Sequence, residues 1–520
     1  MVPILSFWGK TKSIDGAGED WKPLLHHLID VAVTALELQK SVPNRLAREA
    51  RGLGVDPDAL ARVRAVLAGL HDLGKVARAF QAKSPHHFPE NTLGAFKPED
   101  GLHSVNHGRV TAHLLANEMP DIVEGAVECA LREDIAAVAS TIGGHHGWPL
   151  PTEFNLQSRE RQVIVDPLAI PVAREIAENV FTLFGNPLVE LDEADPERWV
   201  SRFCWSLAGL TTLADWVGSD SEFFGFEDVT LEGAAYLGLA VEAARNALSA
   251  KGLRPATPSA ETGMRPLFGV TEPRPMQEMA ERVALPEGPT LAIIEDVTGT
   301  GKTEAAIVVA HRMMRAGKAE GVYFALPTMA TANAMFERLV AAHRRLFEDG
   351  SRPSLALLHG RRDLSECFRS VRLGKASAGG EVAAACAAWI ADDRRRAFFA
   401  DIGAGTIDQA LLSVLPRRFL ALRQHGLAGK VLIIDEAHAY DAYMGEELKT
   451  LLRFHAAAGG SAIVLSATLT RTTRDSLAAA FRRGLATEPS APVSDAYPLL
   501  TISGAQDVQS SPVAASPTAE

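Results

Sequence analysis

Residues 291–306 read LAIIEDVTGTGKTEAA, and this stretch decides the fold class of the second half of the chain. The apolar run LAIIE predicts a buried strand, and a glycine-rich turn leads from it into an alanine-rich helix. Such a turn wraps phosphates with backbone N–H groups, while Lys302 supplies charge to the β- and γ-phosphates and Thr303 can ligate magnesium. The stretch therefore predicts a nucleotide-binding P-loop made of Thr298, Gly299, Thr300, Gly301, Lys302 and Thr303.

The opening position of this P-loop is Asp296, where glycine or another small residue is usual. The sequence alone does not settle how a carboxylate at this point affects the geometry of the turn or its electrostatic attraction for phosphate.

A second acidic site follows in KVLIIDEAHAYD, residues 430–441, where Asp435 and Glu436 end an apolar strand. Ligands bind beyond the carboxyl ends of strands in parallel sheets. We therefore expect Asp435 to hold magnesium and Glu436 to orient the attacking water in phosphoryl transfer, which depends mainly on positioning and charge neutralisation.

The pattern around these motifs indicates the architecture. Short apolar runs alternate with longer helical segments after residue 266, which predicts an α/β lobe with a mostly parallel sheet. The preceding half carries apolar residues at helical spacing and predicts an all-α domain. The expected parts are a helical domain at 1–250, a linker at 251–266, the α/β lobe at 267–505 and a disordered tail at 506–520.

Composition narrows the class of protein. No apolar run reaches the roughly 20 residues that span a bilayer, and the N-terminus does not read as a secretory signal, so we expect a cytoplasmic protein with no membrane partner. The four cysteines are far apart and form no CxxC pair, which disfavours a zinc knuckle. A net charge of −12 means that any nucleic-acid-binding face must be local.

The helical half contains an unusual series of histidines and aspartates. His71 is adjacent to Asp72, His145 is adjacent to His146, and Asp215 lies inside an apolar helical stretch. Imidazole and carboxylate together suit divalent transition metals, and paired ions can drive hydrolysis of a phosphoester. Isolated histidines are more often structural, and we interpret the following in that way: His26, His86, His87, His103 and His113.

The order GTGKT, DEAH and SAT (Ser466 to Thr468) resembles the first RecA-like lobe of superfamily 2 helicases over residues 268–470. The resemblance implies that Gln277 in PRPMQ contacts adenine and that Ser466 and Thr468 form the motif that couples ATP hydrolysis to movement. It also implies sequence-independent contact with a nucleic-acid backbone near Thr328, Thr406 and Asp408.

The ordered histidine and aspartate set resembles the HD phosphohydrolase superfamily, and more closely the variant at the N-terminus of CRISPR type I nuclease-helicases. Supporting phrases are WKPLLHHLIDVA, HDLGK, NHG, GGHHG and LADWVGSD. The metal ligands that the resemblance implies are His27, His71, Asp72, His107, His145, His146 and Asp215. They would hold two divalent ions, with manganese, iron, cobalt, nickel and magnesium all possible.

Several assignments within this set stay open. His26 and His27 are neighbours, and the spacing does not choose between them. His107 is followed by Gly108 where the family has an acidic residue. Lys75, four residues after His71, is assigned to steadying a substrate phosphate beside His71 and Asp72, although a solvated lysine would fit equally well.

The fusion of both halves resembles the CRISPR type I effector nuclease, a metal-dependent single-stranded DNA endonuclease with an ATP-dependent helicase module. The resemblance implies recruitment by an RNA-guided surveillance complex onto the displaced DNA strand. The second RecA-like lobe, which supplies transition-state arginines, is not in this sequence, so we expect ATP binding without efficient hydrolysis or unwinding. A separate chain carrying that lobe would be a further partner.

Two rival functions remain. An HD phosphohydrolase could act on small nucleotides with the ATP-binding lobe as its regulator, and it would be indifferent to single-stranded DNA. Alternatively, a noncatalytic docking module would use its metal site only to stabilise the fold.

Overall fold

The computed structural model describes residues 3–12, 21–97, 106–128, 131–148, 150, 166–190, 195–226, 229–351, 353–359, 389–390, 393–488 and 494–516. The chain divides into two compact units, Met1–Ser249 and Ala250–Glu520. The division falls beside the predicted linker at 251–266. That segment belongs to the second unit, because Pro258 bridges Phe347 and helix α13 begins at Met264.

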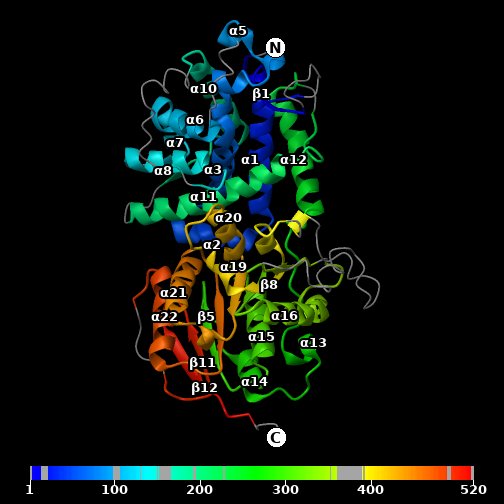
Figure 1. The fold of residues 1–520 in the computed structure, drawn as a ribbon, viewed down its shortest axis with the longest axis vertical. Coiled ribbons are helices and arrows are strands. Elements are labelled where there is room, and N and C mark those ends of the chain that lie inside the picture. The colour runs from blue at the N-terminus through cyan, green and yellow to red at the C-terminus, as the bar shows by residue number, and fades with distance from the viewer. Residues whose placement is uncertain are drawn as a thin grey trace. The chain divides into compact units, whose positions relative to one another are not determined.

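The first unit is a bundle of helices, drawn from blue to green in Figure 1. Its main helical elements are α1 (Leu24–Lys40), α2 (Pro43–Leu53), α3 (Pro57–Gly69), the 3-10 helix η2 (Leu70–Val76), α4 (Arg78–Gln81), α5 (Glu90–Leu93), α6 (His107–His113), α7 (Pro120–Glu124), α8 (Arg132–Gly143), α10 (Ala169–Leu183), α11 (Pro196–Gly218) and α12 (Gly233–Ala250). Shorter pieces are the 3-10 turns η1 (Pro3–Leu5) and η3 (Pro85–His87) and the π-helical turn η5 (Leu114–Glu118).

Helix α1 is the centre of this bundle. Nearly all of its side chains are buried, polar ones included, which happens when neighbouring helices surround a helix on all sides. It packs against α3, α11 and η2. A helix in this position can present polar side chains to a buried site.

Local signals set where the surrounding helices begin. Asn106 accepts a hydrogen bond from Arg109 N and caps α6, so that His107 is the first residue of the helix. Asp195 caps α11 in the same way, followed by Pro196 at its first position. The strand β1 (Trp8–Thr11) pairs antiparallel with β2 (Trp21–Pro23), and β3 (Val127–Glu128) pairs parallel with β4 (Val189–Glu190).

The second unit is built on one sheet with strand order β12-β11-β5-β10-β9-β6-β8-β7. The strands β5, β10, β9, β6, β8 and β7 run parallel, while β11 pairs antiparallel with both β5 and the edge strand β12. Their bounds are β5 (Leu291–Glu295), β6 (Gly321–Leu326), β7 (Leu355–Leu358), β8 (Ile402–Thr406), β9 (Lys430–Ile434), β10 (Ala462–Ser466), β11 (Leu499–Ser503) and β12 (Val508–Pro512).

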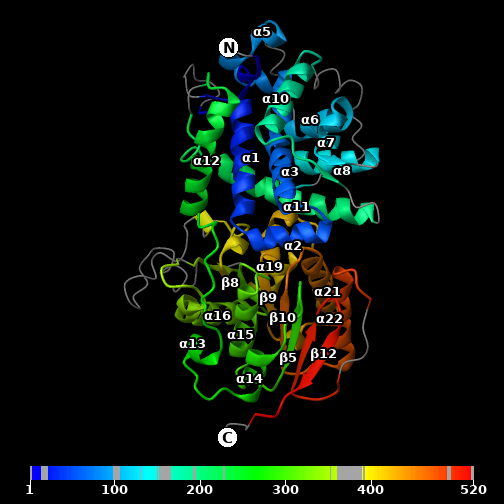
Figure 2. The ribbon, with the colours of Figure 1, turned by 180° about the vertical axis from the view of Figure 1, so that it is seen from behind.

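Helices cover both faces of this sheet, as Figures 1 and 2 show from opposite sides. Along β5, Ala292 and Ile294 belong to one core and Leu291 and Ile293 to the other, because alternate side chains point to opposite faces. The first face packs on α13 (Met264–Phe268), α14 (Pro275–Arg282), α15 (Lys302–Arg315) and α16 (Met329–Ala342). The second packs on α19 (Ile407–Leu411), α20 (Leu420–Ala428), α21 (Ala442–Ala457) and α22 (Arg471–Gly484). Shorter 3-10 turns are η6 (His343–Leu346), η9 (Ala397–Phe399) and η10 (Ala437–Ala439).

The predicted disordered tail at 506–520 is wrong for part of its length. Residues Val508–Pro512 form the edge strand β12, which pairs with β11 over its whole length. An edge strand of this kind is partly exposed and therefore tolerates the polar composition that suggested disorder. Separately, no helix among the described residues is long and apolar enough to cross a membrane.

Candidate metal centre and nucleotide site

The first site is organised around one buried carboxylate, Asp72, which is 3% exposed. It lies with His71 in the 3-10 helix η2, directly after α3. Neighbouring residues of a 3-10 helix project on different sides, so His71 can bond Ala68 O through Nδ1 (3.0 Å) while its Nε2 faces the carboxylates. A carbonyl partner at Nδ1 fixes the tautomer that leaves Nε2 as the ligating atom.

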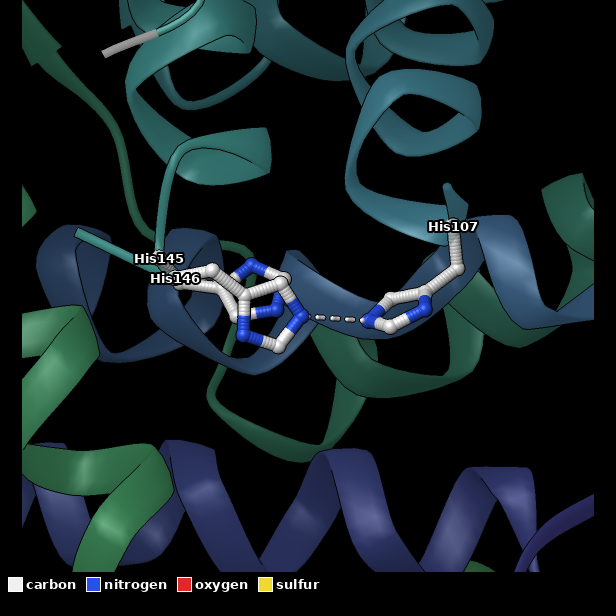
Figure 3. Close-up of side chains that lie close together, drawn as sticks. All are labelled: His107, His145 and His146. Carbon is white, nitrogen blue, oxygen red and sulfur yellow. Dashed lines mark hydrogen bonds between the residues drawn. The ribbon is translucent and has the colours of Figure 1, made fainter. Parts of the chain in front are cut away.

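Imidazoles from three further elements surround Asp72. His27 Nε2, from α1, lies 3.0 Å from Asp72 Oδ2. His107 Nε2, from α6, and His145 Nε2, from the turn after α8, lie 3.0 and 3.4 Å from Asp72 Oδ1. Figure 3 shows His107 and His146 with their rings pointing toward each other, and their Nε2 atoms are 3.0 Å apart.

Asp215 joins the same centre from α11. Its Oδ1 lies 3.4 Å from His71 Nε2. Ser219 Oγ donates a hydrogen bond to this carboxylate over 2.7 Å. All seven ligands expected from the sequence therefore lie in one neighbourhood, contributed by α1, η2, α6, the turn after α8 and α11.

The donor set fits divalent metal ions. His71 Nε2 and Asp72 Oδ1 are buried and make no hydrogen bond in the described part of the chain, although several polar atoms lie near them. Two triads have ligand atoms within 4.8 Å of one another: His27 with His71 and Asp72, and His107 with His145 and His146. Nitrogen and oxygen donors that converge without satisfying each other are typical of a metal site.

Two glycines allow these elements to approach. A Cβ on Gly74 would lie 2.1 Å from His107 O, and one on Gly108 would lie 2.2 Å from Gly143 O. Side chains at either position would therefore push α6 away from η2 or from α8. Gly108, which departs from the family's acidic residue, is required here for the close packing that brings His107 to Asp72.

The structure distinguishes His26 from His27. The His26 ring stacks on Tyr236 with centroids 3.9 Å apart, and its Nε2 bonds Leu231 O over 2.8 Å. His27 points to Asp72 instead. Of the other histidines interpreted as structural, His113 pairs with Glu118 at 3.2 Å, His87 bonds Ser84 and His103 lies outside the described residues.

Lys75 is buried beside the centre. Its Nζ lies 2.7 Å from Asp72 Oδ2 and donates to Gly9 O over 2.9 Å. The expected helical relation to His71 is replaced by a contact with Asp72, three residues earlier, because η2 is a 3-10 helix.

Burial and charge shape the protonation of the centre. Burial lowers the pKa of His145 to about 3 and that of His27 well below its ordinary value, so both imidazoles are neutral, as metal ligands must be. Burial opposes ionisation of Asp72, but His71 and Lys75 hold its pKa well below the usual range. For His71 burial is outweighed by Asp72 and Asp215, which raise its pKa to about 9. Ligation by His71 would therefore release a proton.

The candidate nucleotide site lies at the carboxyl edge of the second unit's sheet. The P-loop follows β5, and Lys302 begins α15. Lys302 Nζ donates to Asp296 O (2.7 Å) and Val297 O (2.8 Å), the backbone of the loop itself. Gly299 and Gly301 both have positive φ, which lets the backbone turn toward a ligand.

Asp296, the unusual residue of this loop, is fully buried. Its Oδ1 accepts a hydrogen bond from Val297 N over 2.8 Å, whereas Oδ2 has no hydrogen-bond partner among the described residues. The carboxylate thus stabilises the turn but leaves negative charge close to Lys302.

The two later motifs are physically connected. His438 Nδ1 lies 3.1 Å from Ser466 Oγ, which also accepts from Thr468 N over 3.2 Å. Asp435 follows β9, Glu436 adopts a left-handed backbone with φ of 51°, and burial raises the pKa of Asp435. Both carboxylates act electrostatically on Lys302, so the P-loop and the acidic motif share one site.

The remaining predicted residues occupy the same edge of the sheet. Gln277 Nε2 reaches Gly301 O at 3.4 Å and its Oε1 accepts from Arg274 N at 3.0 Å, which links the expected adenine contact to the P-loop. Thr328 caps α16 and is exposed, and Asp408 is exposed in the first turn of α19. Thr406 ends β8 and is only 7% exposed, so its side chain is largely covered.

Comparison with known protein families bears on both sites. Residues 8–224 match the family model for the Cas3 HD domain, and residues 274–476 match the DEAD/DEAH box helicase model. The chain joins a Cas3 HD domain to a DEAD/DEAH box helicase domain. The resemblance and the fold class expected from the sequence are thereby confirmed.

Individual Cas3 proteins align over nearly the whole chain. The CRISPR-associated endonuclease/helicase Cas3 of Thermus thermophilus is 34% identical over 493 residues, covering 91% of this chain and 50% of that protein. The Cas3 of Escherichia coli is 31% identical over 541 residues, covering 97% and 58%. The crystal structure of T. fusca Cas3-ATP superposes with a TM-score of 0.83 at 29% identity, covering 99% of this chain and 57% of that one. The chain spans about half the length of the curated relatives it matches.

These families imply a divalent metal in the HD unit and ATP with magnesium in the helicase unit. The sequence reasoning missed Ser219, the hydrogen-bond donor to Asp215. Ser219 follows Asp215 by four residues, which is about one helical turn, and this spacing could have predicted the contact between them.

Proposed function

We propose that this chain is a metal-dependent endonuclease for single-stranded DNA, joined to an ATP-binding helicase module, and that it acts in CRISPR type I interference. The observation that carries the proposal is the convergence of histidines from four elements on Asp72, with buried donor atoms left unsatisfied. Relatives that align with 91% and 97% of this chain are named CRISPR-associated endonuclease/helicases, which supports a nucleic acid as the substrate.

The proposed ligands are the triad that contains Asp72 and the triad of three histidines beside it, with Asp215 completing the set. Divalent ions held there would supply Lewis acidity and a hydroxide-like nucleophile at neutral pH. Asp72 belongs to the first triad, and its Oδ1 lies 3.0 Å from His107 Nε2 and 3.4 Å from His145 Nε2 of the second, so its carboxylate could help to hold an ion at each triad. Manganese, iron, cobalt, nickel and magnesium all accept these donors.

The protein's own groups have complementary tasks. Lys75 brings a positive charge beside Asp72, where it would steady a substrate phosphate. His146 is exposed at the rim of the centre, so a substrate can reach this side of the site. His27 and His71 are fully buried, and the contacts of His27 Nε2 with Asp72 and of His71 Nδ1 with Ala68 O orient their imidazoles.

In the second unit, we propose that the P-loop and Gln277 bind ATP, that Asp435 holds magnesium and that Glu436 orients water. Contacts with the DNA backbone would come from Thr328, Thr406 and Asp408. The coupling of ATP hydrolysis to movement along DNA would depend on Ser466 and Thr468. The contact between His438 and Ser466 supports this coupling, because it connects the acidic motif to the SAT motif.

The proposed partners are the displaced DNA strand, an RNA-guided surveillance complex and a chain or segment carrying the second RecA-like lobe. Guide pairing would provide sequence specificity, so this chain need only hold the backbone. Because the proposed substrate is invading DNA, the proposed place of action is the cytoplasm.

The deciding experiment is cleavage of circular single-stranded DNA by the full chain, after treatment with EDTA and addition of each divalent metal in turn. We expect cutting that depends on metal and that falls by about a hundredfold or more in Asp72→Asn, since the amide removes the negative charge that lies in the first triad and beside the second.

The matched control is Asp121→Asn, which alters an exposed ion pair with Arg174 and should cut like wild type. A folded protein that cuts no DNA with any metal, yet hydrolyses free nucleotides, would replace this proposal with a small-nucleotide phosphohydrolase. Retained cutting in Asp72→Asn would place the chemistry elsewhere.

A further inference from the structure

The N-terminal strand β1 is attached to the metal centre through three consecutive residues. At the first, Trp8 N donates to Gln81 Oε1 (3.1 Å) and Gln81 Nε2 donates back to Trp8 O (3.0 Å). The same Nε2 donates to Lys75 O over 2.7 Å. Gln81, which is fully buried, therefore connects β1 to the 3-10 helix η2, which carries Lys75.

The second residue, Gly9, lies directly against the ligand elements. Its carbonyl accepts the hydrogen bond from Lys75 Nζ at 2.9 Å. A Cβ at this position would lie 2.9 Å from Leu24 Cα and 3.2 Å from His27 Cβ. The strand thus packs on the start of α1, where His27 is located.

The third residue, Lys10, reaches the end of α11. Its Nζ donates to Ser219 O over 2.7 Å, and Ser219 Oγ donates to Asp215 Oδ1 over 2.7 Å. Ser219 is the C-terminal cap of α11, where unsatisfied carbonyls and the helix dipole favour a cation. A continuous chain of contacts therefore runs from Lys10 through Ser219 to the metal-ligand candidate Asp215.

A charge at this position calls for an explanation beyond packing, because a half-buried ammonium costs free energy that an apolar side chain would not. Burial lowers the pKa of Lys10 to about 8, while the carboxylate of Asp215 opposes that shift. Asp215 and Asp72, the two carboxylates of the centre, favour the charged form of Lys10, whereas Lys75 and Lys22 disfavour it.

We propose that Lys10 is a positioning residue of the metal centre, which fixes Asp215 through Ser219 and holds α11 in register with η2 and α1. This inference rests on the proposed metal-dependent function and adds to it a residue outside the ligand set. Lys10 acts through Asp215 and need not touch the substrate.

The test measures metal binding directly, on the full chain, by titrating the metal-free protein with Co²⁺ and recording its visible absorption. We expect Lys10→Met to weaken Co²⁺ binding by about tenfold and to change the spectrum of the bound ion, as loss of a residue that orients a ligand does. Lys10→Arg should recover most of the affinity, because its guanidinium can still donate to Ser219 O.

The matched control is Lys12→Met, an exposed lysine that follows β1 and should bind Co²⁺ like wild type. Ser219→Ala tests the route: if Lys10 acts through Ser219, the double variant should lose less than the product of the two single losses. Circular dichroism of each variant at the titration temperature identifies any loss caused by unfolding.

Two outcomes would overturn the inference. Wild-type affinity and spectrum in folded Lys10→Met would show that Asp215 needs no such support. An equal loss in Lys10→Met and Lys10→Arg, additive with Ser219→Ala, would show that the effect does not pass through Ser219. Failure of the wild-type protein itself to bind Co²⁺ would instead remove the metal centre, and the proposed function with it.

Discussion

Single residues decide how each site is charged, and Asp296 is the clearest case in the P-loop. Its buried carboxylate lies in the loop whose backbone Lys302 contacts, with one oxygen unsatisfied. Negative charge there opposes the phosphates of ATP. We expect Asp296→Asn to tighten ATP binding by about tenfold, a change on the order of 1.4 kcal/mol, because the amide oxygen can keep the bond from Val297 N without the charge.

Titration with a fluorescent ATP analogue measures this effect, and Asp349→Asn, an exposed aspartate in the same unit, is the matched control. Weaker binding in Asp296→Asn would mean that the carboxylate holds the loop in its binding shape. Sequence motifs located the P-loop, but the environment of this carboxylate follows from the surrounding sheet.

At the scale of elements, helix α21 and strand β10 are joined through His455. This histidine is 3% exposed, its Nε2 bonds Ser461 O over 3.0 Å, and burial lowers its pKa to about 4. Because that value lies below the 6.5 of an unfolded histidine, the unfolded chain binds more protons between pH 6.5 and pH 4. The contribution to stability is present above pH 6.5 and is lost as the pH falls.

We expect the second unit to lose about 2 kcal/mol of stability between pH 7.5 and pH 5.0 on account of His455, and His455→Gln to reduce this loss. Hydrogen exchange of peptides from β9 and β10, measured at both pH values, reports it. His425→Gln, a half-buried histidine of α20, is the control. An unchanged pH dependence in His455→Gln would show that other groups account for the loss.

At the scale of the whole molecule, the polypeptide carries one RecA-like sheet in its described part and spans about half the length of its curated relatives. Hydrolysis by superfamily 2 motors requires arginines from a second lobe, and such an arginine contributes about 10³–10⁵ in rate in related phosphoryl transfers. We expect a polypeptide of residues 1–520, assayed by itself, to bind ATP but to release phosphate at no more than about a thousandth of the rate seen when a second lobe is added.

Equilibrium binding of the ATP analogue and steady-state phosphate release, each with and without single-stranded DNA, measure these properties separately. Lys302→Ala should abolish binding and so identify any contaminating ATPase. Turnover near 10 s⁻¹, about the median for enzymes, by the polypeptide alone would contradict the prediction.

The sequence by itself determined the two-part architecture and most of the candidate site residues. The informative motifs are short stretches of neighbouring residues, so they can be recognised without knowledge of the fold. They are GTGKT, DEAH and the adjacent pairs His71–Asp72 and His145–His146. The alternation of short apolar runs with longer helical segments likewise predicted the parallel sheet. Each run and each helical segment is a pattern of neighbouring residues, which can be recognised without the fold.

Only the tertiary structure decided what depends on distant segments. It directed His27 rather than His26 to Asp72, placed Lys10 on the cap of α11, and showed why Gly108 must be small. It also showed that part of the polar tail forms strand β12, because the backbone of β11 pairs with it at the edge of the sheet. Each of these outcomes depends on a contact between residues far apart in the chain, and no local pattern of side chains specifies such a contact.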